Sequence, residues 1–230
     1  MSVRRIAGCL AGGIAAGISL QVATYPLWRR WCLTWGATQE EANGPLSGDD
    51  LLEEPAIVST RAVTVDTAPE AIWPWLVQMG PGRGGAYTYD WIENLFGLNM
   101  HSADELLPAF QDLRVGDAWR LGRRGPVLRV AALDPQRALV LRSDDGQWVW
   151  AFILVPAGTE TRLISRNRIA TAGGTPTARA FAEFVMEPGS LIMERKMLLG
   201  IKDRAERHPD APAEPLVTAG GISGATIRSG

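Results

Sequence analysis

Cysteine and histidine are scarce in this chain, which has two of each. Cys9 and Cys32 both lie near the N-terminus, so they cannot form a disulfide framework for the rest of the chain. His101 and His208 are far apart, and neither has a partner at the short spacing that metal sites use. The sequence therefore supports no metal site, and we expect no cofactor.

An excess of charge of either sign is also lacking. The formal net charge is -2 at pH 7, which argues against a nucleic-acid partner because such proteins normally present a basic face. Hydrophobic residues make up 46% and charged residues 21%, the ordinary proportions of a chain that folds. The 230 residues suffice for one domain with a substantial core and additional segments. Nine tryptophans are many for this length, and we expect several of them in the core or around a cavity.

Long uncharged runs are absent except near the N-terminus. Ile6–Leu27 is rich in Gly and Ala, follows a short basic start, and matches the roughly 20 residues of a membrane helix. Residue types typical of a membrane interface follow, namely Tyr25, Trp28, Arg29, Arg30 and Trp31. We predict that residues 1–31 form a single-pass membrane anchor of unresolved orientation. The alternatives are a signal peptide, cleaved to give a secreted protein, and a helix buried within protein.

Two other segments have the composition of irregular chain. Residues 32–55 are acidic and broken by Gly and Pro, which predicts a linker between the anchor and a domain at residues 56–207. Residues 208–230 are rich in Pro, Ala, Gly and Ser without periodicity, which predicts a disordered tail.

The predicted domain begins with a strand and a helix. Ile57–Val65 is β-branched and alternates, which places Arg61, Val63 and Val65 on one face of a strand. Pro69–Met79 starts with Pro and Glu, the residue types that favour the first turn of a helix.

Five more strands and a long helix follow. The strands are separated by short turns, which predicts an antiparallel meander. They lie near Asp117–Leu121, Val127–Leu133, Ala138–Ser143, Trp148–Val155 and Thr161–Ala170. Thr177–Arg207 has a helical pattern that we expect Pro188-Gly189-Ser190 to interrupt. The order predicts an α+β fold with a curved antiparallel β-sheet wrapped around a long C-terminal α-helix, and an N-terminal hydrophobic helix before it.

Several stretches resemble the SRPBCC group of the START/helix-grip superfamily, whose relatives are polyketide cyclase/dehydrase-like and lipid-transfer-like proteins. The similar stretches are Ala62–Val65, Pro69–Gly80, Gly82–Asn94 and Met193–Lys202, together with Trp35–Thr38, which resembles a membrane-tethered subgroup. The resemblance implies a helix-grip fold with an internal cavity for a hydrophobic small molecule or lipid. It implies no particular activity, because the superfamily contains binders, carriers and enzymes.

Gly80–Gly97 combines a glycine-rich loop with a short aromatic helix and is expected to form a lid over the cavity. The loop lacks the Lys-Ser/Thr pair of a phosphate-binding loop. Tyr87, Tyr89 and Trp91 alternate and are candidate ligand-binding residues, because small-molecule pockets use aromatic side chains with one polar end. They cannot all face inward, and core packing explains Trp91 equally well.

Glu93 and His101 are the tentative catalytic candidates. Asp90 and Glu93 have the spacing either of an acid–base pair or of a capping box, and Glu93 is the better candidate for a polar group in the cavity. A histidine titrates near neutral pH and suits proton transfer, although a lone histidine such as His101 is more often structural or exposed.

The remaining candidate ligand-binding residues come from the last strands and the long helix. They are Trp148, Trp150, Ser165, Asn167, Met193 and Met197. Trp148 and Trp150 share one face of their strand, and Ser165 and Asn167 are polar anchors if their face points inward. The two methionines suit an adaptable apolar wall, and core packing is the alternative.

From the residues and the resemblance we expect a domain that binds a hydrophobic small molecule or lipid, with the membrane as a second partner through the N-terminal helix. One alternative is an enzyme of the cyclase, aromatase or dehydratase type that uses Glu93, His101 or Tyr87 for proton transfer. The other is a non-catalytic interaction module at the membrane whose cavity is filled by core side chains. The oligomeric state is left open by the sequence.

Overall fold

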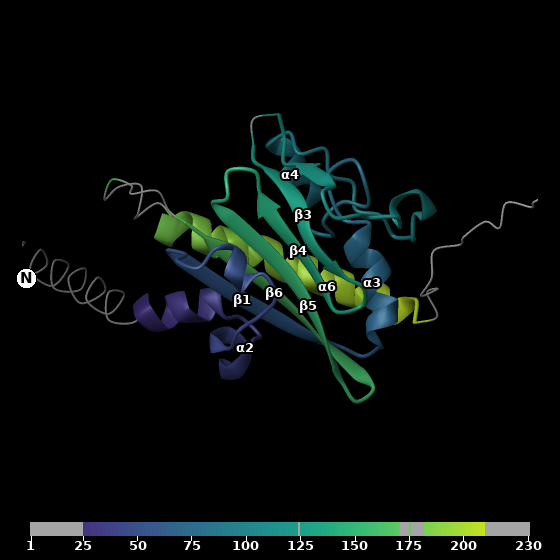
Figure 1. Ribbon diagram of the computed structural model, residues 1–230, viewed down its shortest axis with the longest axis horizontal. Coiled ribbons are helices and arrows are strands. Elements are labelled where there is room, and N and C mark those ends of the chain that lie inside the picture. The colour runs from purple at the N-terminus through teal and green to yellow at the C-terminus, as the bar shows by residue number, and fades with distance from the viewer. Residues whose placement is uncertain (1–24, 124, 171–174, 176–181, 210–230) are drawn as a thin grey trace, which may run out of the picture.

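The computed structural model describes residues 25–123, 125–170, 175 and 182–209 (Figure 1). Its centre is a six-stranded antiparallel sheet with the strand order β1-β6-β5-β4-β3-β2. The strands are β1 (Ile57–Val65), β2 (Ala118–Arg120), β3 (Val127–Asp134), β4 (Ala138–Ser143), β5 (Trp148–Ala157) and β6 (Glu160–Ile169). The helices are α2 (Gln39–Asn43), α3 (Pro69–Val77), α4 (Asp90–Leu95) and α6 (Glu187–Arg207). Short 3-10 turns lie at Asp49–Leu51 and Pro108–Phe110, and a π-helical turn lies at Ala182–Met186.

The predicted fold class is confirmed. Every strand lies within one or two residues of its predicted range. Strands β2 to β6 pair with their neighbours in chain order, and β1 pairs with β6. The register of the β3–β4 pair shifts between Val130 and Ala132, as it does at a β-bulge. The long helix α6 runs across one face of this sheet (Figure 1). The sheet and helix therefore have the helix-grip arrangement.

Helix α6 continues without a break through the Pro-Gly-Ser segment near its start. We expected Pro188-Gly189-Ser190 to interrupt it, and this prediction is wrong, because α6 is continuous from Glu187 to Arg207. Pro188 occupies the first turn, where a backbone N–H has no helical partner to lose. The part of the predicted helix at residues 177–181 lies outside the described residues.

The concave face of the sheet packs on α6 and α3. Inward residues of β4, β5 and β6, including Leu139, Phe152 and Leu163, meet Leu198 and Ile201 of α6 in one buried cluster. Trp75 and Leu76 of α3 belong to the same cluster. This packing fills the end of the sheet that faces the C-terminal half of α6.

The convex face is covered by the acidic segment that we expected to be a linker. Ala37, Leu46, Leu51 and Leu52 pack against outward apolar residues of the sheet, which are Ala62, Val140, Val149, Ala151, Ile153 and Ile164. The composition of the segment, rich in acids, Gly and Pro, does not indicate this packing. Its acidic residues are paired with arginines that lie more than a hundred residues away in the sequence. The linker prediction is thus corrected for residues 37–52.

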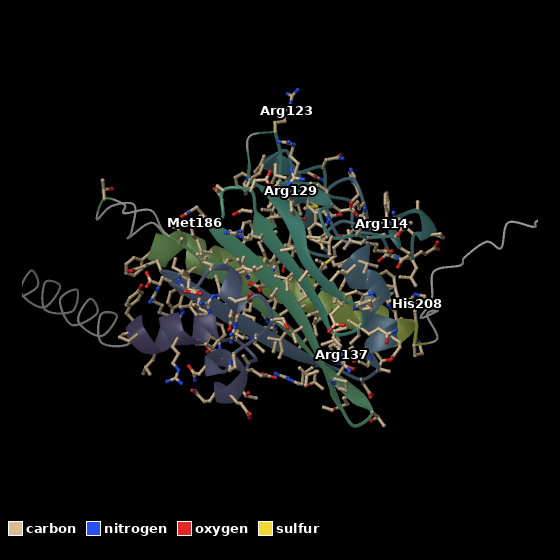
Figure 2. All side chains as sticks on the ribbon, viewed as in Figure 1. Arg114, Arg123, Arg129, Arg137, Met186 and His208 are labelled. Carbon is tan, nitrogen blue, oxygen red and sulfur yellow. The ribbon has the colours of Figure 1, made fainter. Side chains whose placement is uncertain are left out.

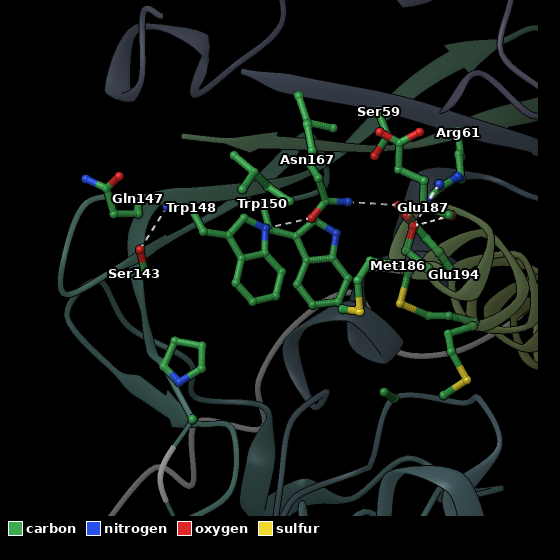
Figure 3. Close-up of a pocket in the computed structure, with 18 of the residues that line it drawn as sticks. Ser59, Arg61, Ser143, Gln147, Trp148, Trp150, Asn167, Met186, Glu187 and Glu194 are labelled. Carbon is green, nitrogen blue, oxygen red and sulfur yellow. Dashed lines mark hydrogen bonds and ion pairs between the residues drawn. The ribbon is translucent and has the colours of Figure 1, made fainter. Parts of the chain in front are cut away.

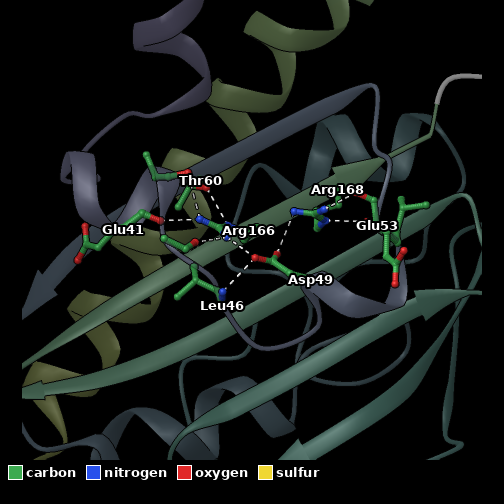
Figure 4. Close-up of polar contacts among 10 residues, drawn as sticks. Glu41, Leu46, Asp49, Glu53, Thr60, Arg166 and Arg168 are labelled. Atoms are coloured by element: carbon green, nitrogen blue, oxygen red, sulfur yellow. Dashed lines mark hydrogen bonds and ion pairs between the residues drawn. The ribbon is translucent and has the colours of Figure 1, made fainter.

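Arginines of β6 hold this segment in place (Figure 4). Arg166 is only 3% exposed, and its guanidinium donates to Asp49 at 2.6 Å and to the backbone oxygens of Glu41 and Gly44. Arg162 forms two hydrogen bonds with the Glu41 carboxylate, and Arg168 donates to the carbonyl oxygens of Leu52 and Glu53. The convex face is therefore closed.

The N-terminal part of the described chain is a helix at residues 25–33 that contacts the start of α6. Arg29 forms an ion pair with Glu187 at 2.7 Å, and the Tyr25 hydroxyl donates to Glu183. In the portion of the chain that the structure describes, no helix is long and apolar enough to cross a membrane. Residues 6–24, most of the predicted anchor, lie outside the described residues, as do residues 210–230 of the predicted tail.

Gly200 of α6 supplies the first test of this packing. An added Cβ would lie 2.6 Å from the carbonyl oxygen of Tyr87 and 2.9 Å from its Cβ, whereas a Cβ on Gly189 of the same helix would contact nothing within 4 Å. Gly200→Ala is expected to lower the free energy of unfolding by about 1–3 kcal/mol through overpacking. Gly189→Ala is expected to be neutral or to stabilise by up to about 1 kcal/mol through helix propensity. Chemical denaturation of both variants measures this difference, and an equal response of the two would contradict the packing described.

Candidate functional site

A pocket of about 740 Å³ lies between the concave face of the sheet and the first half of α6 (Figure 3). Its walls come from β1, β5, β6, α4 with the segment before it, and α6. The lining includes Ser59, Arg61, Thr88, Glu93, Trp148, Trp150, Asn167, Met193, Glu194 and Met197. Met186, labelled at the same end of the molecule in Figure 2, also lines it, whereas His208 lies at the opposite end of α6.

Two tryptophans form one wall. Trp148 and Trp150 are two residues apart on β5, so both side chains project from the concave face, and their rings stack at 5.7 Å with an interplanar angle of 16°. Each indole N–H is bound to β6, because Trp148 donates to Asn167 at 2.8 Å and Trp150 donates to Ser165 at 2.9 Å. Both rings are therefore fixed before any ligand binds.

The carboxylate of Glu194 is the hub of a buried polar network. It is 7% exposed, and it accepts hydrogen bonds from Ser165 at 2.5 Å and from Asn167 at 3.1 Å. It also forms an ion pair with Arg61, which is completely buried. Burial raises the pKa of Glu194, and Arg61, Ser165 and Asn167 oppose that shift.

Each of the three guanidinium nitrogens of Arg61 donates a hydrogen bond within the described chain. Its guanidinium also donates to the Cys32 carbonyl oxygen at 2.9 Å and to the Ser190 hydroxyl at 3.0 Å. The side chain reaches Glu194 because Arg61 lies opposite Ser165 in the β1–β6 register. The ion pair joins β1 to α6, and the hydrogen bonds of its two side chains connect this pair to β6 and to the helix at residues 25–33.

Glu93 differs from Glu194 because its carboxyl is not satisfied. It lines the pocket from α4, is 7% exposed, and its Oε2 has no hydrogen-bond partner among the described residues. Burial raises the pKa of Glu93, the nearby Thr88 hydroxyl acts in the opposite direction, and the charge of Asp90 adds to the rise. The Thr88 hydroxyl oxygen likewise lacks a partner of hydrogen-bond geometry in the described chain.

The structure brings six of the predicted site residues to the pocket wall, namely Glu93, Trp148, Trp150, Asn167, Met193 and Met197. Ser165 lies directly behind this wall, completely buried between Trp150 and Glu194. The face of β6 that carries Ser165 and Asn167 therefore points inward, which is the condition under which the sequence predicted them as polar anchors.

The other four candidates do not line the pocket. Tyr87 is buried in the core, where its hydroxyl donates to the Trp75 carbonyl oxygen at 2.9 Å and burial raises its pKa. Tyr89 and His101 are exposed, and Trp91 is 71% exposed. The aromatic residues of Tyr87–Trp91 thus do not form the expected ligand contact.

The loop expected to be a lid is fastened to its surroundings. Gly80 and Gly85 form a bridge, and the Arg83 side chain donates to the carbonyl oxygens of Val77 and Phe110. Asp90 is not a helix cap, since Tyr89 occupies the cap position and the Asp90 carboxylate accepts from the Ser102 backbone N–H and hydroxyl. The capping-box interpretation is therefore wrong for both acids.

Sequence reasoning missed Arg61 and Glu194 as site residues. Arg61 shares a strand face with Val63 and Val65, so the alternating pattern of the strand indicates that its side chain points inward. Glu194 lies next to Met193 and one turn before Met197 and Leu198, on the buried side of α6. The sequence signal for this pair was a basic residue on the apolar face of a strand together with an acidic residue on the apolar face of a helix, since buried charges occur in pairs.

Comparison with known proteins gives structural similarity only. No protein family and no curated protein matches the sequence. The KanY protein is similar at a TM-score of 0.41 and 16% identity, over 65% of this chain and 97% of that one. A polyketide-cyclase-like protein from Corynebacterium glutamicum is similar at 0.35 and 15%, over 66% and 93%. An AHSA1-like protein from Aeromonas hydrophila is similar at 0.33 and 16%, over 64% and 92%.

The order of elements and the sheet topology define a helix-grip domain with a pocket between sheet and helix. This is the arrangement of sheet and helix that the sequence resemblance implied.

The Arg61–Glu194 pair supplies a test of the network. Glu194→Gln keeps an acceptor for Ser165 but leaves Arg61 buried without a counter-charge, so we expect a loss of about 3–5 kcal/mol in unfolding free energy. Combining it with Arg61→Met is expected to lose less than Glu194→Gln alone, because no unpaired charge then remains. Glu206→Gln, which alters the more exposed pair with Lys202 on the same helix, should change stability by less than about 1 kcal/mol. Additive effects of the two pocket substitutions in denaturation experiments would contradict the ion pair.

Proposed function

We propose that this domain binds a hydrophobic small molecule or lipid in the pocket between the sheet and α6. The observation that carries the proposal is the pocket itself, whose volume of about 740 Å³ lies within the ordinary range of roughly 300–1,000 Å³ for small-molecule sites. A cavity filled by core side chains, as the interaction-module alternative requires, does not have this space.

The chemistry of the wall supports an apolar ligand. Trp148 and Trp150 stack on each other and turn their polar N–H groups to β6, so the ring surface that remains toward the pocket is apolar. Met193 and Met197 line the opposite side from α6 with flexible, polarizable side chains that adapt to irregular shapes. A rigid wall facing an adaptable one suits binding of a bulky apolar molecule.

The enzyme alternative has less support. Of the three residues proposed for proton transfer, only Glu93 reaches the pocket, while Tyr87 is packed in the core and His101 is exposed. A general acid or base must lie within hydrogen-bond reach of the reacting group. Binding is therefore the function that the described geometry favours.

We further propose that the domain is held at a membrane by its N-terminal segment. The uncharged run Ile6–Leu27 leads into the helix at residues 25–33. Leu27, Trp28 and Trp31 of that helix are 72%, 41% and 53% exposed. Exposed tryptophans beside an uncharged run are typical of a membrane interface.

Ligand binding is tested with protein purified without detergent. We expect mass spectrometry of a denatured extract to show an apolar compound, and the neutral fluorescent probe N-phenyl-1-naphthylamine to bind in its place after extraction and refolding. Met193→Trp places a larger side chain into the pocket and should weaken probe binding by about tenfold, the effect of losing roughly 1.4 kcal/mol. Ile192→Trp adds the same bulk at a neighbouring position that is 56% exposed, and should change binding less than twofold. The proposal is overturned if no compound copurifies and the two variants bind the probe equally well.

The membrane proposal is tested by fractionation of cells that express the full chain. We expect the chain to remain in the membrane pellet after an alkaline carbonate wash, at a mass near 24.9 kDa. Ile14→Asp with Ile18→Lys should release it, since each charge at the centre of a membrane helix costs about 2.5–3.5 kcal/mol. Ile192→Trp serves as the control that stays in the pellet. A soluble full-length chain would contradict the anchor, and a chain shortened at its N-terminus would establish the signal-peptide alternative.

A further inference from the structure

Two polar atoms of the pocket wall are fully shielded from solvent and have no partner in the described chain. They are Oε2 of Glu93 and the hydroxyl oxygen of Thr88, which lie near each other on the segment that enters α4. Glu93 is more than nine-tenths buried. A buried polar group without a partner costs about 1–3 kcal/mol, and more when it is charged, so this arrangement favours a molecule that supplies the missing hydrogen bond.

Five other buried polar residues that line the pocket are already matched. Asn167 accepts from Trp148 and donates to Glu194, and Glu194 also binds Arg61. Glu187 is paired with Arg29, and the Ser143 hydroxyl donates to Asp145. A ligand that used any of these groups would first have to break an existing hydrogen bond or ion pair. Glu93 and Thr88 therefore differ from these five residues, because a ligand can bind them without breaking an existing interaction.

The charges of the lining have one sign in excess. Its acidic residues are Glu93, Asp145, Glu187 and Glu194, and Arg61 is the sole basic one among the described residues that line it. Arg61 is completely buried and its charge is paired with Glu194, while its other two guanidinium nitrogens donate to Cys32 and Ser190. No free cation of the described wall remains to bind a carboxylate or a phosphate. An anionic group would instead enter next to carboxylates, which repel it.

We infer that the ligand carries a hydrogen-bond-donating amine or hydroxyl group, which binds Glu93 and Thr88, and that it carries no anionic group there. This inference rests on the proposed function and names its ligand class. An ammonium group donates to the Glu93 carboxylate and neutralises it, and a hydroxyl donates to Glu93 while accepting from Thr88. Glu93 thereby determines specificity, and the tryptophan and methionine walls hold the apolar body.

The test compares three probes with the same ten-carbon chain, namely decylamine, decanol and decanoate, as competitors of N-phenyl-1-naphthylamine at pH 7.5. Decylamine and decanol are expected to displace the dye at concentrations at least about tenfold lower than decanoate. In Glu93→Gln, which keeps the size of the side chain, the preference for decylamine over decanoate should fall by about tenfold. Glu206→Gln makes the same change near the C-terminal end of α6, outside the pocket lining, and should leave the preference within about twofold.

Each outcome bears on a different statement. Displacement by decanoate as effectively as by decylamine in the unchanged protein overturns the inference without any variant, while ligand binding as such stands. An unchanged preference in Glu93→Gln, or an equal fall in Glu206→Gln, overturns the role of Glu93. Failure of all three probes and of the dye itself overturns the proposed function and this inference with it.

Discussion

The ion pair between Arg61 and Glu194 is the constraint on which the rest of the pocket depends. Removing two charges from water is unfavourable, and it is offset only where each remaining donor and acceptor is satisfied. Here Glu194 accepts hydrogen bonds from Ser165 and Asn167. These two side chains in turn accept hydrogen bonds from the indole N–H groups of Trp150 and Trp148, respectively. The position of the tryptophan rings on β5 is thus set by a carboxylate on α6. Because Arg61 also binds the Cys32 carbonyl oxygen, the helix at residues 25–33 is fixed by the same pair.

Strand β6 connects the two faces of the sheet through its alternation. Ser165 and Asn167 point to the pocket, while Arg166 and Arg168 point to the acidic segment on the convex face. The concave face needs small polar groups that reach Glu194 without filling the cavity. The convex face needs long side chains that reach the backbone oxygens of residues 41–53. One strand therefore stabilises a closed outer face and leaves the inner face open to a ligand.

Periodicity was sufficient for the sheet and for the inward face of β6, because a strand alternates whatever its neighbours are. It was insufficient where tertiary partners decide. Tyr87 lies in a buried turn at a φ of 57°, so its side chain enters the core although its neighbours in sequence suggested a lid. The acidic segment resembled a linker because its counter-charges lie on β6, far away in the sequence. Glu194 looked like an ordinary helix acid until Arg61 of β1 was placed beside it.

Glu93 and Glu194 show how the same residue type has opposite roles in one pocket. Both carboxyls are 7% exposed, and burial raises the pKa of each. Glu194 is surrounded by donors that its own fold supplies, so it organises the wall and has nothing further to bind. Glu93 retains an oxygen without a partner, so the free energy of its burial is recovered only by a molecule from outside. Satisfied groups define the shape of this pocket, and the unsatisfied group on α4 is where its selectivity arises.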